Sequence, residues 1–213
     1  MTILITTPDH DDSCAYMRAW SQEIVELAKE KYPETIRLDK KSVTRREFEG
    51  RIEALNPKLV ILNGHGSEEE VSGQGREEII LKFNENDELM KGRIVYARAC
   101  GSAAKLGKSC VEKGAVAYVG YKNDFYLLWD KNMITRPLHD EIAGPFMEVS
   151  NVIPKAIIKG NSIREALERT EEKLKDRIEY LETKRSFDAQ FIVPLLILNA
   201  INQQIHGNLD AAL

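Results

Sequence analysis

Short runs of apolar, mostly β-branched residues alternate with segments of helical periodicity through the first half of the 213-residue chain. The runs predict strands at residues 3–6, 35–38, 59–62, 93–98 and 115–120. Segments with apolar residues at helical spacing predict helices between them, at residues 16–31, 44–55 and 103–113. This alternation predicts an α/β fold, in which a mostly parallel sheet is covered by helices on both faces.

Helices are expected to dominate the C-terminal part, at residues 138–149, 162–183 and 194–205. Ser162 with Glu165, and Thr44 with Glu47, have the spacing of a capping box at a helix start. The glycine-rich polar stretch at residues 66–78 is expected to be a surface loop, after which IILKF at residues 79–83 could form a short strand or hairpin arm. We therefore expect a single domain spanning residues 1–213. Its core sheet would lie within about residues 1–125 and its helical part within about residues 137–213.

Composition excludes several classes of protein. The net charge of −4 argues against nucleic-acid binding, which requires a clustered basic surface. The apolar runs are shorter than the roughly 18 residues of a membrane span, and the N-terminus lacks the pattern of a secretory signal. These two observations predict a cytoplasmic protein without membrane contact. The three cysteines match no zinc or disulfide spacing, so free thiols are expected, with no metal and no cofactor.

Two of the predicted strands end in a reactive side chain beside a glycine. His65 follows the end of the third strand in LVILNGHG, and Cys100 follows the end of the fourth in IVYARACGS. In open parallel sheets, functional groups lie beyond the carboxyl ends of the strands, and neighbouring strands are only about 4.8 Å apart. The sequence thus permits a Cys–His dyad.

Nucleophilic catalysis by a thiol needs such a pair, because a thiol of ordinary pKa is mostly protonated at neutral pH. The N–H groups of Gly66 and Cys100 are the expected donors to a developing oxyanion. Each residue also has an ordinary interpretation: Cys100 as a small buried hydrophobe and His65 as a turn residue. The residues alone leave both interpretations open.

The two blocks together resemble the double signature of the caspase-like (clan CD) cysteine peptidases, which include caspases, gingipains and clostripain. EKGAVAYVGY at residues 112–121 and IIKGNSIREALERT at residues 157–170 are similar to later segments of the CHAT branch. The resemblance covers roughly residues 58–170. It implies a three-layer caspase-like sandwich and a cysteine endopeptidase, with Cys100 as nucleophile and His65 as acid and base, working through an acyl-enzyme without a metal.

Two features depart from the caspase pattern. The 35 positions between His65 and Cys100 are fewer than the roughly 50 typical of caspases, and Arg98 stands where caspases carry glutamine. The family builds a pocket for the residue before the scissile bond partly from the loop after the first strand. Here Asp11 and Asp12 in that loop, with Asp124, would favour a basic residue, whereas Arg98 would favour an acidic one or simply pair with an aspartate. A basic preference is the expectation.

Other polar and thiol side chains receive ordinary interpretations. Cys14 and Cys110 are expected to pack in the interior, and His10 to be a solvated loop residue. One alternative function is a latent or non-catalytic caspase-like binding module that depends on an activating partner. Another is an amidotransferase-like hydrolase, although those usually place the histidine after the cysteine. The expected partner is a protein or peptide substrate. The apolar segment at residues 191–205 would either pack across the sheet or join two subunits in a homodimer.

Overall fold

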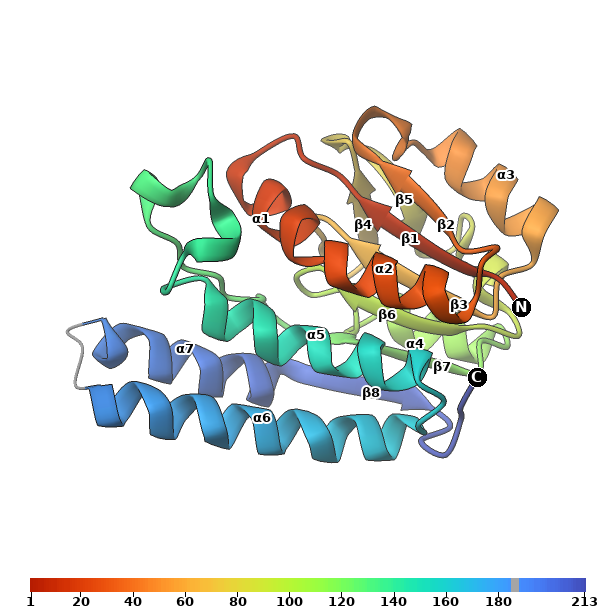
Figure 1. Ribbon diagram of the computed structural model, residues 1–213. Coiled ribbons are helices and arrows are strands. Elements are labelled where there is room, and N and C mark those ends of the chain that lie inside the picture. The colour runs from red at the N-terminus through yellow and green to blue at the C-terminus, as the bar shows by residue number, and fades with distance from the viewer. Residues whose placement is uncertain (185–187) are drawn as a thin grey trace.

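The computed structural model describes residues 1–184 and 188–213, and within them a six-stranded sheet forms the centre of the molecule (Figure 1). The strand order is β2-β1-β3-β6-β7-β8. The bounds are Ile3–Thr7 (β1), Ile36–Asp39 (β2), Leu59–Asn63 (β3), Ile94–Arg98 (β6), Ala117–Tyr121 (β7) and Gln203–Gly207 (β8). The first five strands run parallel to their neighbours, and β8 pairs antiparallel with β7. The α/β class with a mostly parallel sheet is thereby confirmed.

Alternate side chains of the central strands enter two separate hydrophobic cores. On β3, Leu59 and Ile61 belong to one core, whereas Val60 and Leu62 belong to the other. All four are fully buried. This period of two explains why the strands read as continuous apolar runs, because a sheet covered on both faces has no solvated side.

Helices cover both faces of the sheet (Figure 1). Their bounds are Asp12–Trp20 (α1), Gln22–Lys31 (α2), Arg45–Leu55 (α3), Leu106–Glu112 (α4), Gly144–Ile158 (α5), Ile163–Lys184 (α6) and Ala189–Asn202 (α7). Helices α2, α5 and α6 pack on the face that carries Ile61, and α3 and α4 on the face that carries Leu62. Four short 3-10 helices lie at Lys40–Ser42 (η1), Asp87–Met90 (η2), Lys131–Met133 (η3) and Pro137–His139 (η4).

The predicted helix starts are confirmed where a capping residue marks them. The Thr44 hydroxyl accepts a hydrogen bond from the Glu47 N–H at 3.3 Å and caps α3. At the start of α6, the Ser162 hydroxyl accepts from the Glu165 N–H, and the Glu165 carboxylate accepts from the Ser162 N–H. Both pairs satisfy backbone donors that the first turn of a helix leaves without partners.

Residues 66–78 do not form the predicted surface loop. They contribute to an antiparallel hairpin of β4 (Glu70–Gly73) and β5 (Gly75–Lys82), which packs over the sheet beside α3. Three apolar side chains of the hairpin enter the core: Val71, Ile80 and Leu81. The loop prediction failed because Val71 is the only large apolar residue at 66–78, so this stretch lacks the alternation that marks a strand, whereas residues 79–82 of the expected hairpin arm do form the end of β5.

The sheet also extends beyond the predicted 1–125 limit, because β8 comes from the C-terminal part. The predicted helix at 194–205 instead begins at Ala189 and gives way to β8 at Gln203. The predicted helix at 16–31 is divided into α1 and α2 at Ser21. No helix in the described parts of the chain is long and apolar enough to cross a membrane.

Candidate active site

The structure brings the strands before His65 and Cys100 together, which confirms that they are neighbours. Strands β3 and β6 pair in register, with Asn63 opposite Arg98, so His65 and Cys100 each lie two residues beyond a matched pair. The loops after the strands stay in contact: a Cβ added to Gly66 would lie 2.7 Å from the Cys100 carbonyl oxygen. Only a glycine at position 66 permits this approach.

The Cys100 sulfur lies against the loop after β7. It accepts a hydrogen bond from the Phe125 N–H at 3.3 Å. Burial raises the pKa of the Cys100 thiol, the Phe125 N–H lowers it, and nearby Asp124 raises it further, so the net pKa is above the ordinary value. The resting thiol is therefore protonated at neutral pH.

Cys100 is among the residues that line a shallow surface cavity of about 570 Å³. Its lining includes Gly66, Cys100, Asp124, Tyr126 and Leu198. Helix α7 supplies Leu198 and Asn202 to this lining. The cavity is large enough for a side chain of an extended peptide.

The imidazole of His65 is held by Asp11 rather than by the thiol. The His65 Nε2 and the Asp11 Oδ2 are 2.5 Å apart, and the other carboxylate oxygen caps α1 by accepting from the Cys14 N–H at 2.9 Å. Burial alone would raise the pKa of Asp11, but the hydrogen bonds from Cys14, His65 and Ser13 outweigh it and hold that pKa far below its usual range. Asp11 is thus an ionised residue that orients His65.

His65 and Cys100 open onto different hollows of the surface. His65 lines a small cavity of about 170 Å³ with Ser72 and Arg76, and Gly66 lines both this cavity and the one at Cys100. Among the contacts of the described residues, none joins the Cys100 sulfur to the His65 ring. The structure thus brings the two backbones together but leaves the two reactive groups apart.

The two expected oxyanion donors are backbone N–H groups at this junction. Gly66 and Val71 form an isolated antiparallel bridge. The bonds of this bridge run from Ser67 N–H to the Glu70 carbonyl and from Ser72 N–H to the His65 carbonyl. The Gly66 N–H therefore takes no part in it, and the predicted role of this group is compatible with the structure.

The predicted substrate-binding residues are found in four different environments. Asp124 is exposed and lines the cavity at Cys100. Asp12 is exposed on the first turn of α1, and Asp11 is engaged by His65. Arg98 is fully buried. Of the four, Asp124 alone lines the cavity at the nucleophile.

The burial of Arg98 argues against its predicted place in a substrate pocket. Its guanidinium donates to the Asn151 Oδ1 at 2.6 Å and approaches the sulfur of Met147 on α5. Asn151 in turn donates to the carboxylate of Glu23 at 2.8 Å. The contacts described for Arg98 include none of the aspartates with which it was predicted to pair. Its side chain instead extends into the layer of α5, where Met147 and Asn151 lie.

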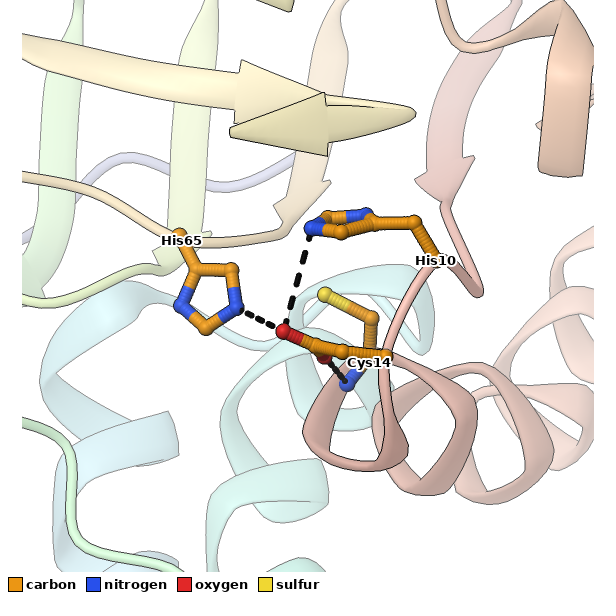
Figure 2. Close-up of side chains that lie close together, drawn as sticks. His10, Cys14 and His65 are labelled. Carbon is orange, nitrogen blue, oxygen red and sulfur yellow. Dashed lines mark hydrogen bonds and ion pairs between the residues drawn. The ribbon is translucent and has the colours of Figure 1, made fainter. Parts of the chain in front are cut away.

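His10 and Cys14, for which the sequence favoured ordinary roles over functional ones, lie beside His65. Figure 2 shows the two imidazoles and the Cys14 thiol directed toward one point. The rings of His10 and His65 meet edge to face with centroids 5.5 Å apart. The interior position predicted for Cys14 is confirmed, as is that of Cys110, whereas His10 is only 16% exposed and is not the solvated residue expected. With Asp11, these side chains form a group that could hold a metal ion.

Comparison with known proteins adds no assignment. No protein-family model matches the chain, and no match was found among curated proteins. The site must therefore be interpreted from its own geometry.

Proposed function

We propose that the protein is a caspase-like cysteine endopeptidase in which Cys100 attacks the peptide carbonyl and His65 transfers protons. The observation that carries the proposal is the matched register of β3 and β6, which sets both residues at one edge of a parallel sheet. The surface cavity that Cys100 lines supports it. Helices on both faces of the sheet are compatible with the three-layer sandwich of that family.

Three neighbouring groups support the chemistry. Asp11 fixes the His65 ring through Nε2, which leaves Nδ1 as the nitrogen available for proton transfer. The Phe125 N–H donates to the sulfur and stabilises the thiolate once it forms. The N–H groups of Gly66 and Cys100 are the donors for the oxyanion.

The reaction begins from the protonated thiol. His65 takes the proton as the sulfur forms a bond to the substrate carbonyl carbon, and the carbonyl oxygen becomes the oxyanion. Collapse of this intermediate breaks the peptide bond, and His65 gives its proton to the leaving amine. Water, deprotonated by His65, then hydrolyses the acyl-enzyme and regenerates the thiol.

A basic residue before the scissile bond is the preference that the cavity supports best. Asp124 and Glu68 line it, and the buried Arg98 does not. Lys122 also lines the cavity and Lys105 forms an ion pair with Glu68 at 2.9 Å, so Asp124 is the acidic group on which the preference depends.

A latent form of the same peptidase is the alternative that a specific observation favours. The raised pKa of Cys100 and the engagement of His65 with Asp11 describe a resting state in which nucleophile and base are not paired. A substrate or an activating partner would then have to bring the imidazole to the sulfur.

The test is covalent labelling with acyloxymethyl ketone peptides that carry Arg, Lys, Asp or Leu next to the reactive group. Intact-mass measurements would compare the wild type with Cys100→Ala, His65→Ala and Asp124→Asn. His139→Ala is the matched control, because it removes an exposed histidine on η4.

We expect labelling of the wild type and the control, none in Cys100→Ala, and a loss of about 100-fold or more in His65→Ala. Asp124→Asn should lower the rate for Arg and Lys probes and spare the Leu probe. Labelling that is independent of His65 would overturn the dyad. Labelling that appears only after another protein is added would identify the latent form.

A further inference from the structure

Four side chains with metal-ligating atoms converge where the loop after β1 meets the loop after β3. One ligand atom from each of His10, Asp11, Cys14 and His65 lies within 4.8 Å of all the others. Ligands at 2.0–2.3 Å around a tetrahedral ion are about 3.3–3.8 Å apart. The pair His10 Nε2 and Asp11 Oδ2, at 3.8 Å, already has this separation.

His10 supplies a second, independent indication of a ligand. Both of its ring nitrogens are buried, and neither has a hydrogen-bond partner among the protein groups that the structure describes. Buried polar atoms without hydrogen-bond partners are uncommon in folded proteins, because they lose their bonds to water without replacement. The ring is nevertheless held beside Asp11 and against the His65 ring. A metal ion at the centre of the group would satisfy one of these nitrogens.

We propose that His10, Asp11, Cys14 and His65 form a tetrahedral binding site for a thiophilic divalent cation of the zinc type. Two imidazoles, a thiolate and a carboxylate are the ligand types that zinc prefers, and the thiolate disfavours Mg²⁺ and Ca²⁺. The two anionic ligands would balance the charge of the ion, so the half-buried site would be neutral when occupied.

The protonation of the ligands affects how tightly a metal would bind. Burial lowers the pKa of His10, which favours the neutral ring that a metal requires. Burial and then Asp11 raise the pKa of Cys14, so a cation would have to displace the thiol proton, and metal binding should weaken as pH falls. Arg76 lies 4.0 Å from Asp11, but its side chain is 74% exposed and is free to turn into solvent.

The ion would regulate the proposed peptidase, and this part of the inference rests on the function proposed above. A metal bound to Nε2 replaces the hydrogen bond from His65 to Asp11 and withdraws the carboxylate from the ring. With Nε2 bound to the ion, the neutral imidazole carries its hydrogen on Nδ1, so it could not accept the proton of Cys100. Occupation of the site would thus inhibit acylation without any contact with the nucleophile.

Metal binding is tested first on Cys100→Ala, which removes the half-exposed thiol outside the group. The protein, freed of metal with a chelator, is titrated with Co²⁺ and then with Zn²⁺. We expect one equivalent of Co²⁺ to give intense tetrahedral visible bands and a thiolate charge-transfer band, all displaced by Zn²⁺. Adding Cys14→Ser should abolish the charge-transfer band, and adding His10→Gln should weaken binding on the order of 100-fold.

Regulation is tested on the protein with Cys100 intact, by the ratio of probe labelling rates without and with Zn²⁺. We expect a ratio of at least about ten in the wild type and a much smaller one in His10→Gln. The proposed site would be refuted if Co²⁺ gave no tetrahedral bands. It would also be refuted if the bands persisted in both Cys14→Ser and His10→Gln while the circular dichroism of these variants stayed native. If the bands appear but no probe labels the wild type, the metal site stands and the proposed peptidase activity fails.

Discussion

Replacement of Gly66 by alanine tests the close approach of the two loops on which the site depends. The added Cβ would lie 2.7 Å from the Cys100 carbonyl oxygen and 2.9 Å from the Ala99 Cβ, where ordinary contact begins at 3.4 Å. The backbone of one loop must therefore retreat by about 0.7 Å. Because Gly66 is not among the glycines with positive φ, the effect is steric and not conformational. Overpacking of this kind costs about 1–3 kcal/mol.

Gly50→Ala is the matched control for this substitution. Gly50 lies within α3, where an added Cβ meets nothing within 4 Å, so alanine should stabilise the protein by about 0.5–1 kcal/mol. Urea unfolding followed by circular dichroism should therefore separate the two variants by about 1.5–4 kcal/mol. In the same samples, labelling of Cys100 should slow in Gly66→Ala only. Equal stability of Gly66→Ala and the wild type would refute the contact between the loops.

Three further substitutions test the fold. Asp87 is fully buried; burial raises the pKa of its carboxyl, but Lys113, Ser109 and the Asn84 N–H lower it more, so the net pKa is below the usual value. Asp87→Asn should cost about 3 kcal/mol at neutral pH. A carboxyl whose pKa is lowered in the folded state stabilises the protein above its unfolded pKa near 3.9, and this stabilisation is lost as pH falls through the folded-state pKa. The urea midpoint of Asp87→Asn should therefore fall less on acidification than that of the wild type. An equal fall in both proteins would contradict this. Ile61→Ala, in the middle of β3, should lower the free energy of unfolding by about 2–5 kcal/mol, and a loss below 1 kcal/mol would contradict its place in the core. Thr44→Ala should cost about 0.5–2 kcal/mol through the lost cap of α3, whereas Thr44→Ser should keep most of it.

The central sheet could be predicted from the sequence because its strands are buried on both faces. Strands β3 and β6 read as uninterrupted apolar runs, and their parallel pairing follows from the helices between them. Strand β8 could not be found in this way. Its sequence QQIHG contains a single apolar residue, because an antiparallel edge strand is held by its backbone ladder to β7 and only partly by its side chains.

The candidate site was predictable only where local sequence determines position. His65 and Cys100 could be located because each follows the end of a buried strand. The contact of Asp11 with His65 spans 54 residues, and no spacing rule connects the two. Arg98 was misassigned because alternation places side chains on opposite faces of a strand but does not tell which face leads to the cleft.

The C-terminal segment completes both the sheet edge at β7 and the loop beside Cys100. Asn199 and Asn202 on α7 bind the backbone of Tyr126 and Asp124, and so hold the loop that presents the Phe125 N–H to the Cys100 sulfur. In a chain that lacked α7 and β8, β7 would be an open sheet edge, and the loop that carries Phe125 would lose its contacts with Asn199 and Asn202. Such a chain would contain both reactive side chains and would still lack the surroundings that organise Cys100.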